Sequence, residues 1–152
     1  MTGQAHLLNE LIEITRDGEL FYQHAEARVQ DAQLKALFRD MAALKAEVIR
    51  DLALEVAAEH EQPSSGHSLT GSLRQLYADG RARLAADGEV AYVGQLEAAE
   101  DRLLQAFEQA LGEADASEVA LLEAELVKLR AGHARMSQMQ RTINQAGASA
   151  RH

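Results

Sequence analysis

The sequence contains no cysteine and no tryptophan, and proline occurs once in 152 residues. Without cysteine the chain forms no disulfides, no thiolate metal sites and no cysteine nucleophile, and it fits a reducing compartment such as the cytoplasm. Aromatic residues make up 4% of the chain, so its core has to be built mainly from Ala, Leu, Val and Met. This composition, with a single proline, favours helices.

Positive charge is also scarce. The chain has 15 Lys and Arg against 24 Asp and Glu, a formal charge of −9, and its basic residues are dispersed among acids. Nucleic-acid binding requires basic side chains that neutralise phosphates, so this balance argues against it. No segment approaches the roughly 20 apolar residues of a membrane span, and the N-terminus lacks the pattern of a signal peptide. We therefore expect a soluble cytoplasmic protein that binds neither nucleic acid nor membranes.

Apolar residues recur at helical spacing along most of the chain. Asp31 occupies an N-cap position, and Asp115-Ala-Ser-Glu118 resembles a capping box that opens the last helix. The segment 61–67 holds the single proline and is predicted to be a loop. Residues 147–152 are predicted to form a flexible tail. The pattern predicts helices over residues 4–29, 32–60, 68–85, 88–111 and 116–146.

The connections between the predicted helices differ in length. The joint near Asp31 and the turn near Ala114 are very short, so each should join two antiparallel neighbours. A long crossover that contains the short fifth helix, over residues 68–85, connects the two hairpins. One long crossover is the ferritin-like arrangement, whereas plain up-and-down bundles use short loops throughout. The sequence therefore predicts an all-α, ferritin-like four-helix bundle, with residues 1–146 as a single domain.

Several polar residues fall on the apolar faces of the predicted helices. Glu100 and His133 are central on the third and fourth long helices, and Tyr22 is central on the first. Lys45 falls in the apolar sector of the second helix, and Glu97 lies toward the edge of the third. A buried charge has to be paired, protonated or bound to a metal. We predict a buried polar cluster in which Lys45 neutralises Glu100 or Glu97, while Tyr22 and His133 supply hydrogen bonds.

A metal site in the bundle core is the alternative to this cluster. Glu19, Glu97, Glu100 and His133 would then hold a single divalent ion, with iron, manganese and zinc as candidates. A ferritin-like di-iron centre needs a Glu from each of two helices and a Glu-x-x-His motif from each of the other two. His133 follows Arg130 at this spacing instead of Glu, and the second helix has no such motif. The expectation is therefore no cofactor, with a metal as the alternative.

Several motifs resemble those of an uncharacterised bacterial family. They are Leu8-Asn9-x-Leu11-Ile12, Asp17-Gly18-x-x-Phe21-Tyr22, Leu34-Lys35-x-Leu37-Phe38, Ser68-Leu69-x-Gly71, Glu97-x-x-Glu100-Asp101 and the late His133. The resemblance spans roughly residues 6–140. It implies a four-helix bundle of the ferritin-like superfamily, distantly related to rubrerythrin and ferritin. It implies no established activity, because the family's function is unknown, although its members are often associated with stress responses.

The sequence shows no nucleophile elbow and no glycine-rich phosphate loop. We therefore expect a non-enzymatic protein that acts as a homo-oligomer or through a protein partner, with the face of residues 68–85 as one available interface. The resemblance adds a stress-related role to this expectation. The alternative is a metal-binding or redox protein with a partial carboxylate and histidine site in the bundle core.

Overall fold

The described part of the chain is helical. The computed structural model describes residues 3–64 and 88–150. Within these ranges it contains no strand, which confirms the all-helical class, and the predicted helix over residues 68–85 lies outside them. The last helix continues beyond Ala146, where the sequence predicted it to end. The helices are α1 (Gly3–Arg28), α2 (Ala32–Ala58), α4 (Glu89–Glu113) and α5 (Ala116–Ala150).

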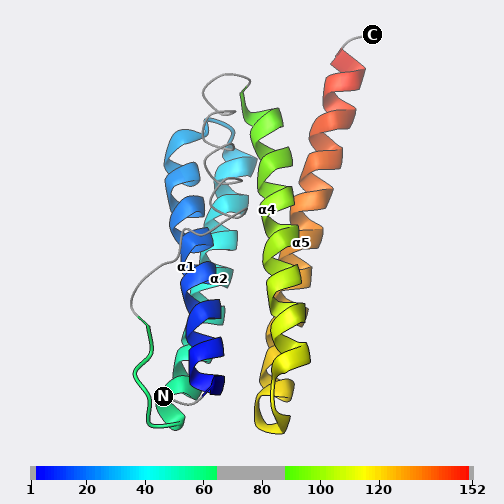
Figure 1. The fold of residues 1–152 in the computed structure, drawn as a ribbon. Helices are drawn as coiled ribbons and strands as arrows, with labels where there is room; N and C mark the ends of the chain where they lie inside the picture. The colour runs from blue at the N-terminus through cyan, green and yellow to red at the C-terminus, as the bar shows by residue number, and fades with distance from the viewer. Residues whose placement is uncertain (1–2, 65–87, 151–152) are drawn as a thin grey trace.

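The helices form two antiparallel hairpins, α1 with α2 and α4 with α5 (Figure 1). Helices α2 and α4 run in the same direction, so the end of α2 and the start of α4 lie at opposite ends of the bundle. The start of α4 is hydrogen-bonded to the α1–α2 turn: the backbone N–H of Gln30 donates to Oε1 of Glu89 at 2.6 Å. Helix α5 is 35 residues long, and its C-terminal part extends beyond the other three helices (Figure 1).

Aspartate side chains cap the starts of α2 and α5. The backbone N–H of Leu34 donates to Oδ1 of Asp31 at 2.9 Å, which confirms Asp31 as an N-cap. The backbone N–H groups of Ser117 and Glu118 donate to Oδ1 of Asp115 at 3.1 and 3.3 Å. Both caps satisfy donors that have no partner within the helix. They explain why each hairpin turns within a few residues.

Replacing Asp31 by Ala is expected to destabilise the protein by about 1 kcal/mol, because the Leu34 N–H then loses its acceptor. Urea unfolding followed by circular dichroism measures the change. Asp31→Asn is the matched control, since its amide oxygen still caps the helix, and it should stay within a few tenths of wild type. Equal losses in the two variants would show that charge, and not capping, is what Asp31 contributes.

The segment after α2 is held against α1. The side-chain amide of Asn9 donates to the backbone oxygen of Gln62 at 3.1 Å, and its Oδ1 accepts from the backbone N–H of Ser64 at 2.8 Å. Glu13 accepts the Ser64 hydroxyl at 2.8 Å, and Arg16 donates to the Ser64 carbonyl at 3.1 Å. Asn9, Glu13 and Arg16 lie on one side of α1 because they are four and three residues apart. They direct the first residues of the crossover along α1.

The buried apolar residues form two clusters, one toward each end of the bundle. One cluster includes Met41 and Ala42 on α2 with Ala99 on α4, and the other includes Val48 on α2 with Leu103 on α4. All four helices contribute to each cluster. Polar residues occupy the positions between the clusters. No helix within the described ranges is long and apolar enough to cross a membrane.

Candidate functional site

A buried polar contact lies between the two apolar clusters. It joins Tyr22 of α1, Lys45 of α2 and Glu100 of α4, whose exposed fractions are 0%, 0% and 1%. The Tyr22 hydroxyl donates to Oε1 of Glu100 at 2.7 Å. Nζ of Lys45 donates to Oε2 of Glu100 at 2.9 Å and lies 2.8 Å from Oε1. The same Nζ is 5.4 Å from the centre of the Tyr22 ring, within range of a cation–π interaction. We call these three residues the core triad.

The core triad is neutral and internally satisfied. Lys45 compensates the charge of Glu100, and both oxygens of that carboxylate have a donor. This is the condition under which a buried ion pair is tolerated, because charge and hydrogen bonds are both matched. A metal ion at Glu100 would have to displace an ammonium group from the same carboxylate. The geometry is therefore that of a structural contact, which ties α1 and α2 to α4.

The other residues of the predicted cluster do not join the core triad. Glu97 is half-buried and accepts the hydroxyl of Ser137 on α5 at 2.7 Å. His133, one turn before Ser137, is half-buried and takes part in no hydrogen bond or ion pair within residues 3–64 and 88–150. Glu19 is half-buried on α1. In the described chain, no three of Glu19, Glu97, Glu100 and His133 lie within metal-ligand reach of one another.

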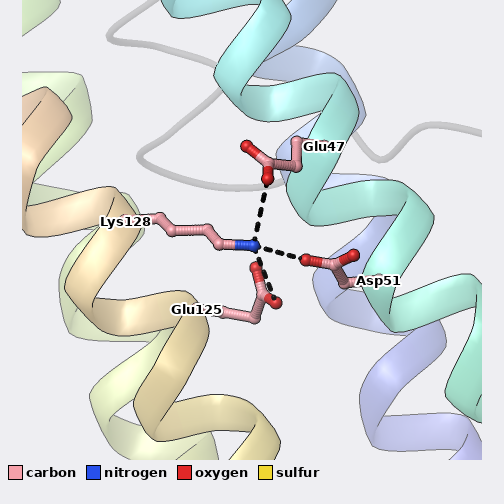
Figure 2. Close-up of polar contacts among 4 residues, drawn as sticks. All are labelled: Glu47, Asp51, Glu125 and Lys128. Atoms are coloured by element: carbon pink, nitrogen blue, oxygen red, sulfur yellow. Dashed lines mark hydrogen bonds and ion pairs between the residues drawn. The ribbon is translucent and has the colours of Figure 1, made fainter.

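A second polar group, which we call the Lys128 group, lies between α2 and α5 (Figure 2). Nζ of Lys128 is 2.6 Å from Oδ2 of Asp51, 3.3 Å from Oε1 of Glu47 and 3.7 Å from Oε1 of Glu125. Glu125 is 2% exposed, whereas the other three side chains are partly accessible to solvent. One cation therefore faces three carboxylates, and charge alone does not balance.

A proton on Glu125 reduces the excess negative charge of the Lys128 group. Burial, followed by a hydrogen bond to Asp51, raises the pKa of Glu125 to about 8. Protonated Glu125 then donates to Asp51, and this hydrogen bond, together with that from Lys128, lowers the pKa of Asp51. The hydrogen bond to Asp51 raises the pKa of Lys128 to about 12. At neutral pH the group therefore holds Lys128 charged, Asp51 ionised and Glu125 neutral.

Three glutamates converge where the end of α2 meets the start of α5, and we call them the acidic junction. Glu55 lies in the last turn of α2 and Glu59 is the C-cap residue that follows it, while Glu118 is fully buried in the first turn of α5. One carboxylate oxygen of each lies within 4.8 Å of the others. Burial, a hydrogen bond shared with Glu59, and the charges of Glu59, Glu55 and Asp115 raise the pKa of Glu118 to about 8.

Sequence reasoning missed the Lys128 group and the acidic junction. Helical periodicity predicts that Glu47 faces solvent, and it predicts Glu118 only as part of a capping box. The available signal was the recurrence of acids every four residues at Glu47, Asp51, Glu55 and Glu59. Such a row usually marks a solvated helix face. It becomes informative only once the position of α5 beside α2 is known.

These observations define a class, an all-helical protein whose described residues form a four-helix bundle with an ion pair in its core. A family model described as "Domain of unknown function (DUF2383)" matches residues 4–113. The match covers more than half of the chain, and the chain belongs to this family. The matched range includes the whole core triad and ends before α5. No curated protein and no solved structure matches the chain.

Proposed function

We propose that this protein is a ferritin-like bundle without catalytic activity that acts by self-association. The observation that carries the proposal is the closed core triad, in which both oxygens of Glu100 are engaged by Tyr22 and Lys45. In ferritin-like di-metal proteins, inward-facing carboxylates of the bundle core bind the metal. Here an ammonium group lies against the central carboxylate, so the carboxylate has no unpaired oxygen for a substrate or an ion.

The path of the chain supports the ferritin-like part of the proposal. Parallel α2 and α4 need one long crossover, which distinguishes ferritin-like bundles from plain up-and-down bundles. Both hairpins contribute to both apolar clusters, which supports a single domain over residues 1–146. A cytoplasmic and stress-related role, implied by the resemblance to the bacterial family, belongs to the same proposal.

A groove between α2 and α5 supports a second copy of the chain as the partner. The groove has a volume of 570 Å³, and Leu37, Ala134 and Met139 are among its apolar lining residues. A smaller pocket of 280 Å³ at the same end is lined in part by Met139 and Ile143. The C-terminal part of α5 extends past the bundle at this end (Figure 1). In a two-fold dimer, the extended part of α5 in each copy packs into the groove of the other.

Thr142→Glu tests this dimer, because Thr142 is an exposed residue that lines both openings. Wild type is expected to sediment as a dimer, and Thr142→Glu as a monomer, since the new charge would have to be moved from water into the interface. Ala124→Glu adds the same charge at an exposed position of α5 outside the groove and should remain dimeric. Sedimentation equilibrium measures the mass of each. A monomeric wild type, or a dimeric Thr142→Glu, contradicts the proposed assembly.

A further inference from the structure

The acidic junction contains buried carboxylate oxygens without donors. Glu118 is fully buried, and its Oε2 accepts no hydrogen bond within the described chain. The buried Oε2 of Glu59 accepts none either. The other oxygen of Glu118 accepts the hydroxyl of Ser117 at a long distance of 3.4 Å. Because buried polar atoms in native proteins nearly always have partners, these oxygens require a proton or a bound ion.

The surroundings of the acidic junction are negative. No ion pair joins Glu55, Glu59 or Glu118 to a basic side chain in residues 3–64 and 88–150, and the last turn of α2 contains no basic residue. A helix C-terminus carries partial negative charge and favours cations nearby. The ammonium group of Lys128, on the same helix as Glu118, is already paired with Asp51. The junction therefore has no compensating basic side chain in the described chain, and the raised pKa of Glu118 means that a cation has to displace a proton there.

The spacing of the oxygens matches that of ligands around one ion. The three ligand atoms all lie within 4.8 Å of one another. Two oxygens that bind the same Ca²⁺ at 2.3–2.6 Å lie at most about 5 Å apart, and those around Mg²⁺ at most about 4 Å. A ligand set of carboxylates without His or Cys favours hard cations. The donor chemistry thus selects a hard cation, and oxygens within 4.8 Å of one another can hold Ca²⁺ as they stand, whereas Mg²⁺ would draw them closer together.

We propose that Glu55, Glu59 and Glu118 bind one hard divalent cation, of the class of Mg²⁺, Ca²⁺ and Mn²⁺. Each carboxylate supplies an oxygen, and water completes the coordination, as is usual for these ions. Because α2 and α5 belong to different hairpins, the bound ion connects the two hairpins at the end opposite the groove (Figure 1). The site is independent of the proposed dimer, and either can be tested without the other.

The test is calorimetric titration of the chelator-treated full chain with Mg²⁺, Ca²⁺ and Mn²⁺ separately, in salt that suppresses diffuse binding. At least one of the three is expected to bind one site per chain. Glu118→Gln should lower that affinity by about tenfold or more. Removing a direct metal ligand weakens binding more than removing a residue that only hydrogen-bonds to a ligand. The same cation should raise the thermal midpoint of wild type by more than that of Glu118→Gln.

Glu125→Gln is the matched control, since Glu125 is another buried acid of α5 but belongs to the Lys128 group. It should bind the cation as wild type does. The proposal is overturned if none of the three cations binds, or if Glu118→Gln binds as tightly as wild type. Equal weakening by Glu118→Gln and Glu125→Gln also overturns it, because binding would then reflect the general acidity of the chain.

Discussion

Lys45→Met is expected to destabilise the protein by about 3–5 kcal/mol, the largest loss that we expect from a single substitution in this chain. The substitution removes the ammonium group that lies 2.8 Å from Oε1 of Glu100. Glu100 is 1% exposed, so its charge cannot be taken up by solvent. Tyr22 supplies one hydrogen bond to the carboxylate but no compensating charge. Guanidinium unfolding followed by circular dichroism measures the difference.

Most of this loss should be recovered in Lys45→Met/Glu100→Gln. The double variant removes both charges and keeps an oxygen at position 100 that can accept the Tyr22 hydroxyl. Replacing both members of a buried ion pair is often near neutral, whereas removing one leaves an uncompensated charge. Measuring Glu100→Gln as well completes the double-mutant cycle for the pair. A loss below about 1 kcal/mol in Lys45→Met, or equal losses in the single and double variants, would contradict the core triad.

Raising the pH from about 4.5 to about 8 is expected to lower the stability of wild type relative to Glu125→Gln. The pKa of Glu125 rises from 4.5 to about 8 on folding, so the folded state binds this proton more tightly than the unfolded state does. The contribution of Glu125 is fully present below pH 4.5 and is lost as pH rises through about 8. The slope between these values should reach about 1.4 kcal/mol per pH unit.

Asp51 and Lys128 titrate outside this window. Asp51, with a lowered pKa, loses its contribution only in acid, below its ordinary value of 3.8. Lys128, with a pKa of about 12, loses its contribution above its ordinary value of 10.5. Urea unfolding at several pH values in chelator gives the difference curve. Glu123→Gln, an exposed acid on the same helix, should parallel wild type, and a parallel curve for Glu125→Gln would show that Glu125 is ionised in the folded protein.

The helical class and the capping of α2 could be predicted because they depend on local pattern. Apolar residues at helical spacing gave the helices, and Asp31 is followed by the Leu34 N–H that it caps. Lys45 and Glu100 fall within the apolar stripes of their own helices, which is where the structure buries them. Their placement needed no information about neighbouring helices.

Contacts between helices could not be predicted in this way. They depend on how each helix is rotated about its own axis and on how far it is shifted along its neighbour. Glu97 accepts the hydroxyl of Ser137, one turn beyond His133, although the sequence predicted Glu97 and His133 in one cluster. Glu118 is buried because α5 begins against the last turn of α2, which no periodicity within α5 reveals. The core metal site with Glu19, Glu97, Glu100 and His133 stays a prediction of the sequence.

The metal content of the purified protein distinguishes a core in which Tyr22 and Lys45 occupy Glu100 from a core that binds metal at Glu100. Wild type and Lys45→Met/Glu100→Gln are purified without chelator, and their iron, manganese and zinc are measured by elemental analysis. Because Lys45 and Tyr22 already occupy the oxygens of Glu100, the two proteins are expected to have the same metal content per chain. Stoichiometric metal in wild type that is absent from the double variant would place an ion at Glu100 and contradict a structural role for the core triad.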